Sequence, residues 1–250
     1  MSIVSKYRDI VLTILESINQ ERVAIDEAAK MIADRIAEDG LVYVGHGGAH
    51  SGIGLEELFY RAGGLACINP MMDEGVCLTN GAVRTTKVER TPGYGRTVVD
   101  LHGVKKDDVV IITTSVGITS MAVDEALECK ERGATVIAIT STSFAENTPA
   151  GHVSRHPSNK NLHEIADVFV DCHVPFGDAV LELDDLNQKF AATSTIALTF
   201  AEYSIIAKAI QLLKERGVEP PIWRSANTPG GDAVNSRYIE RYAARIKHLV

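Results

Sequence analysis

The chain has 250 residues, 45% hydrophobic and 23% charged, which is enough for one large α/β domain or two small ones. Its formal net charge of -8 disfavours a surface for nucleic acid or anionic membranes. No uninterrupted apolar run approaches the roughly 18–20 residues that span a bilayer, and residues 1–19 lack a signal-peptide pattern. We therefore expect a cytoplasmic protein in which four scattered cysteines are reduced: Cys67, Cys77, Cys129 and Cys172.

The first 39 residues carry two helical patterns. Apolar residues recur at helical spacing from Tyr7 to Ile18 and again from Ile25 to Ile36, and Asp39-Gly40 ends the second run. These patterns predict an N-terminal extension, residues 1–39, that consists of two amphipathic helices.

Beyond residue 40 the pattern changes to short, continuously apolar runs, which are typical of strands buried on both faces. These runs are Leu41–Val44, Val109–Thr113, Thr135–Thr140 and, more weakly, Val168–Val170. Helical stretches separate them at Leu55–Ala62, Ser120–Arg132 and Ile196–Arg216. Strands that alternate with helices predict right-handed crossovers and a parallel, doubly wound sheet in residues 40–217.

Three segments fit this scheme poorly. Residues 69–102 are long and contain prolines, and we expect them to add a weak strand and a short helix. Residues 141–162 form a long polar loop, a kind of segment that is often functional. A Pro/Gly-rich stretch then leads to a final helix, Asn235–Leu249, within a C-terminal extension of residues 218–250. We expect the whole chain, 1–250, to form a single domain.

A glycine-rich loop, Gly-His-Gly-Gly-Ala-His-Ser-Gly at residues 45–52, follows the first strand. Ligands of open parallel sheets bind beyond the carboxyl ends of the strands. Glycines let the backbone approach a ligand, and free N–H groups at a helix start attract anions. Gly47, Gly48 and Ser51 are therefore candidate substrate-binding residues. A dinucleotide site is the rival interpretation, but its fingerprint needs a glycine where His50 stands.

Hydroxyl side chains follow the next strong strand and open another helix. Thr114, Ser115, Gly117, Thr119 and Ser120 are candidate ligands for phosphate or sulfonate oxygens. Ordinary N-capping is the alternative, because serine and threonine favour that position. Ser141 follows the third strand in the same way.

The stretch Ile196–Leu213 is apolar almost all round, which predicts burial in the core or in a subunit interface. Glu202 lies in its middle. A buried carboxyl has a raised pKa that suits a general base. Two alternatives remain open: Glu202 lies at an exposed edge of the helix, or it is paired with a neighbour such as Lys208.

Together these elements resemble the sugar isomerase (SIS) phosphosugar-binding domain over nearly the whole chain. The similar blocks are residues 44–64, residues 114–140 and Thr193-Ser194-Thr195 at the start of the long helix. Within this family, UPF0309-type proteins are similar in further stretches: Ser154-Arg155-His156 with Lys160, Glu219-Pro220-Pro221, and Ser225-Ala226-Asn227 with Gly230-Gly231-Asp232. Residues 47–50 also resemble the glycine loop of phosphoheptose isomerases.

The resemblance implies a three-layer αβα sandwich with a five-stranded parallel sheet. It also implies a homodimer or homotetramer with shared sites, no cofactor, and a phosphate loop at residues 114–119. Family members usually carry Ser-x-Ser-Gly-x-Thr there, and this chain has Val116 at the second serine. By position, the family's catalytic carboxylates fall on Glu202 and Glu57.

These observations predict an aldose–ketose isomerase that acts on a phosphorylated or otherwise anionic sugar through an enediol, with no metal. Glu202 is the expected base, and His50 or Glu57 handles the ring or carbonyl oxygen proton. His156, with Arg155 and Lys160, is expected to close over the site. The alternatives are a sugar-phosphate sensor without catalysis and an amino-sugar phosphate lyase or etherase, which shares the enolisation at C2.

Overall fold

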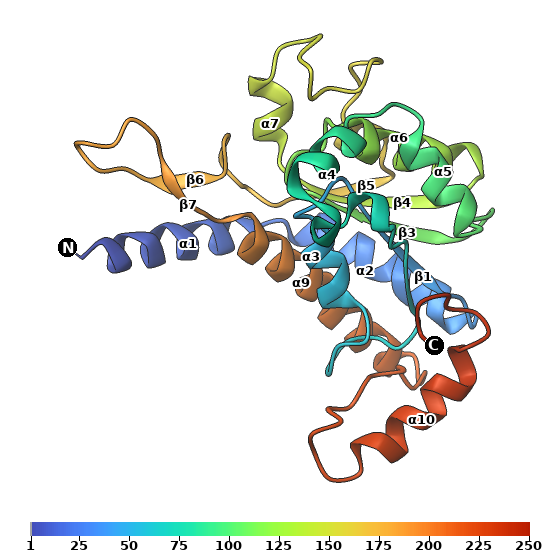
Figure 1. Cartoon of the computed structure of the whole chain (residues 1–250). Coiled ribbons are helices and arrows are strands. Elements are labelled where there is room, and N and C mark those ends of the chain that lie inside the picture. The colour runs from blue at the N-terminus through green and yellow to red at the C-terminus, as the bar shows by residue number, and fades with distance from the viewer. Residues whose placement is uncertain (1) are drawn as a thin grey trace.

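The computed structural model describes residues 2–250 and contains a parallel sheet of five strands in the order β2-β1-β3-β4-β5 (Figure 1). The strands are β1 (Val42–His46), β2 (Ile68–Pro70), β3 (Val109–Thr113), β4 (Thr135–Thr140) and β5 (Val168–Asp171). In the register of the central pair, Val42 lies opposite Val109 and His46 opposite Thr113. β3 and β4 have the predicted bounds, and β2 lies at the start of the segment where a weak strand was expected.

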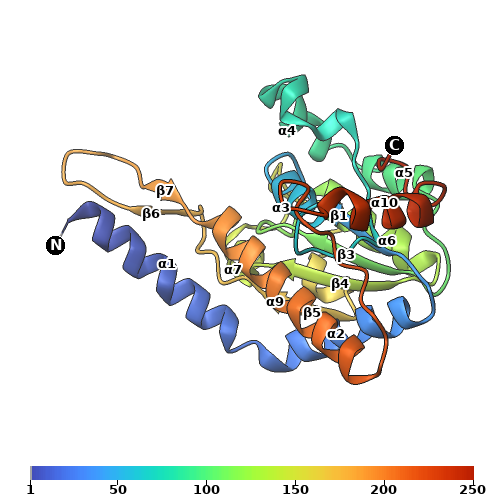
Figure 2. The ribbon, with the colours of Figure 1, turned by 90° about the horizontal axis from the view of Figure 1, so that it is seen from below.

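Helices cover both faces of the sheet (Figures 1 and 2). One layer consists of α2 (Arg22–Ala37), α3 (Gly52–Leu58) and α9 (Ser194–Glu215). The other contains α5 (Tyr94–Leu101), α6 (Ser120–Glu131) and α8 (Leu162–Ile165). The predicted three-layer, doubly wound αβα sandwich is therefore confirmed.

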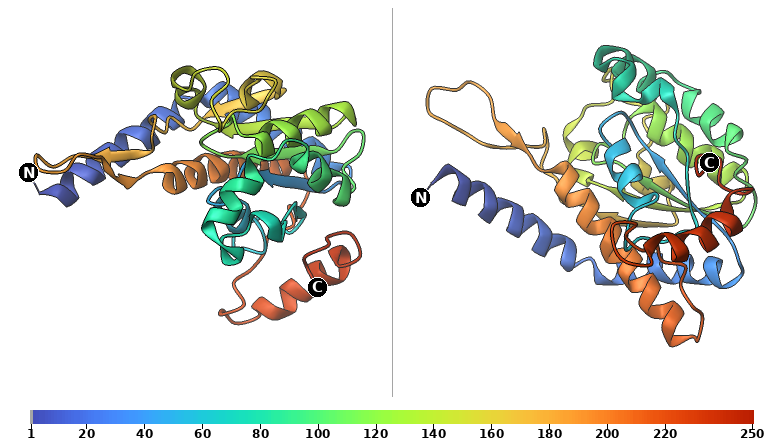
Figure 3. Two further views of the ribbon diagram at one scale, coloured as in Figure 1. Left: turned by 45° about the horizontal axis from the view of Figure 1, so that its top comes forward. Right: turned by 60° about the horizontal axis from the view of Figure 1, so that its bottom comes forward.

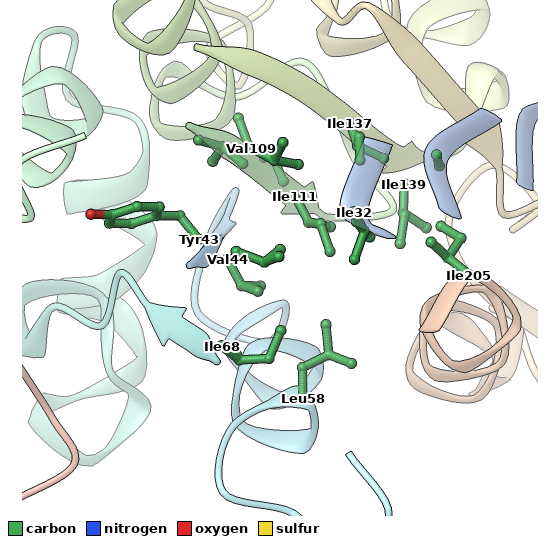
Figure 4. Packing of buried hydrophobic residues seen from close by; sticks show 14 of the residues in the cluster. Ile32, Tyr43, Val44, Leu58, Ile68, Val109, Ile111, Ile137, Ile139 and Ile205 are labelled. Atoms are coloured by element: carbon green, nitrogen blue, oxygen red, sulfur yellow. The ribbon is translucent and has the colours of Figure 1, made fainter. Parts of the chain in front are cut away.

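The core lies on both faces of the sheet, and α2 and α9 cover one of these faces. Figure 4 shows Ile32 of α2 and Ile205 of α9 directed toward Ile137 and Ile139 of β4. Ile32 and Ile205 are fully buried. Complete burial of such a side chain stabilises the fold by about 1.5–3 kcal/mol.

Helix α9 is also the one helix in residues 2–250 that is long and apolar enough to cross a membrane, with 22 residues and a mean hydropathy of 1.4. The search for uninterrupted apolar runs in the sequence did not detect this helix, because polar residues interrupt it. The core helix of a soluble protein passes the same test, and α9 packs against α1, α2 and α3. We therefore interpret α9 as the core helix of a soluble protein.

Several elements differ from the sequence expectation. Residues 69–102 form two helices, α4 (Ala82–Glu89) and α5, besides two short 3-10 turns, where one helix was expected. The polar loop contains α7 (Thr142–Asn147). The antiparallel pair β6 (Ala179–Leu181) and β7 (Phe190–Ala192) was not predicted, because apolar runs of three residues are too short to indicate a strand.

An arm extends from the sheet, formed by α1 (Ile3–Asn19) and the β6–β7 hairpin (Figures 2 and 3). The Tyr7 hydroxyl donates to the Ala192 carbonyl at 2.6 Å and joins the two parts. Of the described α1 side chains, only Ile14 and Ile18 are buried. Large apolar side chains are exposed along the arm and the adjoining start of α9: Ile3, Val4, Leu12, Leu183, Leu186, Ile196 and Phe200.

The C-terminal extension returns to the β2 edge of the sheet. The Ala66 N–H donates to the Pro221 carbonyl at 2.7 Å, and the Trp223 N–H donates to the Gly64 carbonyl at 2.9 Å. Its helix, α10, spans Gly231–Tyr242 and so ends before the predicted Leu249. Arg241 and Arg245 form ion pairs with Asp39.

Because Ile205 fills the interface between α9 and the sheet, Ile205→Ala leaves a cavity that we expect to lower the free energy of unfolding by about 2–5 kcal/mol. Urea denaturation followed by circular dichroism measures this loss. Val23→Ala, at an 82% exposed position, is the matched control and should change stability by less than about 0.5 kcal/mol. Equal losses in the two variants would contradict the assigned packing.

Candidate active site

The strand order reverses between β1 and β3, because the chain leaves β1 toward β2 and then returns to the other side for β3. A cavity of about 490 Å³ lies at the carboxyl ends of these two strands. This is the place where open parallel sheets bind ligands. The glycine loop, the start of α3, the end of α4, the loop after β3 and the start of α9 all contribute to its wall.

The structure brings part of the predicted site together at this cavity. The predicted residues that line it are Gly47, Gly48, His50, Ser51, Thr114, Ser115 and Thr119. The predicted residues outside its lining are Glu57, Gly117, Ser120, Ser141, Arg155, His156, Lys160 and Glu202. The two loops that follow β1 and β3 therefore form the site, and the 141–162 segment contributes little to it in this chain.

The hydroxyl groups of the cavity largely bond to the protein itself. Ser51 donates to the Thr114 hydroxyl oxygen at 3.0 Å, and the Val116 N–H donates to the same oxygen at 3.3 Å. Thr119 donates to the Gly47 carbonyl at 2.8 Å and accepts from the Ala122 N–H as the N-cap of α6. The capping alternative thus holds for Thr119, and its hydroxyl has no proton left for a ligand.

Three other predicted ligands are bonded to or enclosed by the fold itself. The Ser141 hydroxyl donates to the Val174 carbonyl at 2.6 Å and also caps α7. Ser120 is buried in the first turn of α6. Gly117 has a φ of 41°, and a Cβ there would clash with the Thr140 hydroxyl, so the position requires glycine.

Arg155 and His156 hold the 141–162 segment in shape. The Arg155 guanidinium donates to the Thr148 and Ala145 carbonyls and to the Asn161 amide oxygen. The His156 ring lies 3.2 Å from a carboxylate oxygen of Asp124 and is further bonded to the Ser158 hydroxyl. Lys160 is exposed. The expected closure of these residues over a substrate therefore stays a prediction.

Glu202 is completely buried, and neither carboxyl oxygen has a hydrogen-bond partner within the described chain. Lys208 pairs with Asp26 at 3.3 Å instead. Both alternatives for Glu202, an exposed edge and a pair with Lys208, are therefore wrong. Burial raises the pKa of Glu202 to about 8, the neighbouring Thr113 side chain lowers it in part, and the Glu57 carboxylate raises it further.

The Glu202 carboxyl lies one layer beneath the cavity wall. It contacts Gly54 so closely that a Cβ at Gly54 would clash with it, and Gly54 lines the cavity. Leu198, one turn earlier on α9, also lines the cavity, as does Thr114, which follows Thr113.

Glu57 points elsewhere. Its carboxylate accepts from Arg61 at 2.9 Å, and its backbone carbonyl accepts from the Tyr203 hydroxyl at 3.2 Å. Both partners lie outside the cavity lining. Glu57 therefore reaches this site only through its charge, which acts on Glu202.

Sequence reasoning missed two charged residues at the end of α4. Glu89 accepts a hydrogen bond from the Ala49 N–H at 3.3 Å, and burial raises its pKa. Arg90 lines the cavity and forms no ion pair or side-chain hydrogen bond with any described residue, and its Nε is buried. Their position just before Thr91-Pro92-Gly93, in a segment without clear periodicity, gave no usable signal.

The remaining acidic residue in the lining is already occupied. Asp178 accepts from the Thr193 and Ser194 N–H groups at 2.8 Å each and from the Ser194 hydroxyl at 2.7 Å. It therefore caps the start of α9. Among residues 2–250 no three histidine, cysteine or acidic side chains are grouped to hold a metal ion, and the four cysteines are free thiols.

The buried Glu202 makes stability depend on pH. The pKa of Glu202 is 4.5 in the unfolded chain and about 8 in the folded chain. Between these pH values the native state keeps a proton that the unfolded state loses, so the free energy of unfolding falls as the pH rises from 4.5 to about 8. Relative to Glu202→Gln, the wild type should lose about 4 kcal/mol between pH 5 and pH 8.5. Urea denaturation of both proteins at these pH values measures the difference. A difference that does not change with pH would show that Glu202 ionises normally.

Comparisons with known proteins agree with this architecture. The SIS domain model matches residues 6–141. A UPF0309 protein of Shouchella clausii (strain KSM-K16) is 37% identical over 251 residues, covering 100% of both chains. Another from Geobacillus kaustophilus (strain HTA426) is 36% identical over 93% of this chain and 91% of the relative. The structure of a phosphoheptose isomerase from Neisseria gonorrhoeae shares the fold, with a TM-score of 0.52 and 12% identity, covering 83% of this chain and 98% of that one. The chain therefore belongs to the SIS-domain family and, within it, to the UPF0309 proteins.

Proposed function

We propose that this protein is an aldose–ketose isomerase for a small anionic sugar and works through an enediol. The observation that carries the proposal is the unpartnered Glu202 carboxyl, one layer beneath a cavity at the switch point of the sheet. The SIS-domain family and the fold shared with a phosphoheptose isomerase support a role in binding phosphosugars.

Isomerisation moves a proton between C1 and C2, so the site needs a base whose pKa is near the working pH. Burial gives Glu202 a pKa of about 8. In its ionised form, Glu202 would remove the proton from one carbon and, once protonated, return it to the other. Access to the substrate requires the Gly54 turn of α3 to move aside, so sugar binding and base exposure are coupled in this mechanism.

A second group must move a proton at the carbonyl or ring oxygen. His50 is exposed on the glycine loop and lines the cavity, while Glu57 does not. We therefore assign this step to His50. The Glu89 carboxylate lies close enough to His50 for the charges of the two side chains to interact.

The proposal predicts that Glu202→Gln lowers turnover by about 10²–10⁴-fold, as expected for loss of a general base. For the wild type, kcat/KM should rise with pH up to about 8, because the base acts in its ionised form. A thermal-shift screen of sugar phosphates and sulfonated sugars would identify ligands, and NMR in D₂O would detect exchange of the C2 proton and aldose–ketose interconversion.

Glu56→Gln is the control, because Glu56 has the same side-chain type, is exposed on α3 and lies outside the cavity lining. It should retain most of the turnover. If Glu202→Gln keeps more than about a tenth of wild-type turnover, Glu202 is not the base. Elimination of a substituent accompanied by C2 exchange would instead indicate a lyase or etherase.

A sugar-phosphate sensor without catalysis is the second candidate, and the complete burial of Glu202 favours it. In this structure both carboxyl oxygens are buried, whereas the hydroxyl and glycine residues of the two loops line the cavity. Ligands that raise the melting temperature without any C2 exchange would establish the sensor instead of the isomerase.

We also propose that the arm of α1 and the β6–β7 hairpin joins two copies of the chain and completes the site in a homodimer or homotetramer. The exposed apolar residues of the arm support this, because such a patch on a soluble protein usually marks an interface. The base of the arm, at Ala192 and Ser194, lines the cavity.

Leu186→Glu, in the hairpin, should therefore dissociate the oligomer in sedimentation velocity and lower turnover with it. Val23→Glu, at an 82% exposed position outside the arm, is the control and should leave the sedimentation coefficient unchanged. A wild type that sediments as a monomer at micromolar concentration would contradict the assembly.

A further inference from the structure

The loop that follows β3 has few donors left for an anion. Thr119 is occupied as donor and acceptor, and Val116 brings no hydroxyl. Ser51 gives its proton to Thr114. Among the side chains of residues 114–119, only the Thr114 proton and the Ser115 hydroxyl have no partner among the described residues, and neither group is charged. An anion held there alone would lack a counter-charge, and desolvating an unpaired anion is costly.

The glycine loop is also unsuited to an anion. The Glu89 carboxylate rests against Gly48, where a Cβ would clash with it, and accepts the Ala49 N–H. This negative group occupies one backbone donor of the loop, the Ala49 N–H, and places a negative charge beside the others. A second anion at this end of the cavity would meet like charge.

Arg90 supplies the missing positive charge. It is the only lysine or arginine among the described residues that line the cavity. The other arginines from Arg61 to Arg245 lie outside the cavity lining. The Nε atom of Arg90 is buried and has no hydrogen-bond partner among the described residues. A guanidinium fork matches the geometry of phosphate and sulfonate oxygens.

We propose that Arg90 is the residue that binds the anionic group of the substrate, with Ser115 and Thr114 donating the remaining hydrogen bonds. Glu89, in the same wall, then accepts a sugar hydroxyl. This deepens the proposed function, on which it rests, because it sets the substrate class: a monosaccharide with one phosphate or sulfonate group, and not a bisphosphate.

Arg90→Met tests the assignment with inorganic phosphate, sulfate and hexose monophosphates as probes, in isothermal titration calorimetry. A hydrogen bond to a charged group contributes about 1.5–3 kcal/mol, so the variant should bind each effective probe about 10–100-fold more weakly. Lys87→Met is the matched control, because Lys87 lies on the same helix, is exposed and does not line the cavity. It should bind like the wild type.

Two further variants keep the test decisive. Arg90→Lys preserves the charge and should recover part of the affinity, even if Arg90→Met is less stable. Glu89→Gln removes the repelling charge and should improve binding of a hexose bisphosphate relative to the monophosphate. Comparison of phosphate with sulfonate probes shows which anion is preferred.

The outcomes separate this inference from the proposed function, because binding is measured without turnover. If Arg90→Met binds the probes as tightly as the wild type, or if the wild type binds none of them, the role of Arg90 is overturned. If binding depends on Arg90 but no ligand exchanges its C2 proton, the anion site stands and the isomerase does not.

Discussion

A parallel sheet must be covered on both faces, because its strands are apolar on both sides. This constraint governs the layer formed by α2 and α9. Helix α9 packs against β4 and also against α1, α2 and α3, so it is apolar around most of its circumference. A polar residue in its buried turns therefore loses contact with water. Glu202 is in that position, and its raised pKa follows directly from the packing that holds the fold together.

The same topology places the cavity. Reversal of strand order between β1 and β3 leaves the glycine loop and the 114–119 loop side by side, and their hydroxyls bond mostly to one another and to the backbone. Such a network fixes the shape of the site but carries no net charge. The charges come from the end of α4, where Glu89 and Arg90 place a carboxylate and a guanidinium in one wall. Shape and charge therefore come from different parts of the chain.

Much of the fold could be predicted from the sequence because β3 and β4 are continuous apolar runs, buried along almost their whole length. The positions of Ser51, Thr114 and Ser115 were also predictable, since residues that directly follow strands meet at one edge of a parallel sheet. Arg155 shows the limit. Its residue type suggests an anion ligand, but its partners are carbonyl groups of its own loop, which no sequence pattern reveals. Arg90 lies in a segment without apolar periodicity, so its approach to the cavity depends on tertiary packing alone.

The C-terminal extension bonds to the segment that directly follows α3. The Gly63 N–H donates to the Trp223 carbonyl at 2.8 Å, and the Trp223 N–H returns a bond to Gly64. Helix α3 is thus anchored at its end by a distant part of the chain, while its first turn covers Glu202. No described residue of the extension lines the cavity. It nevertheless holds the far end of the helix whose first turn separates the buried acid from the cavity.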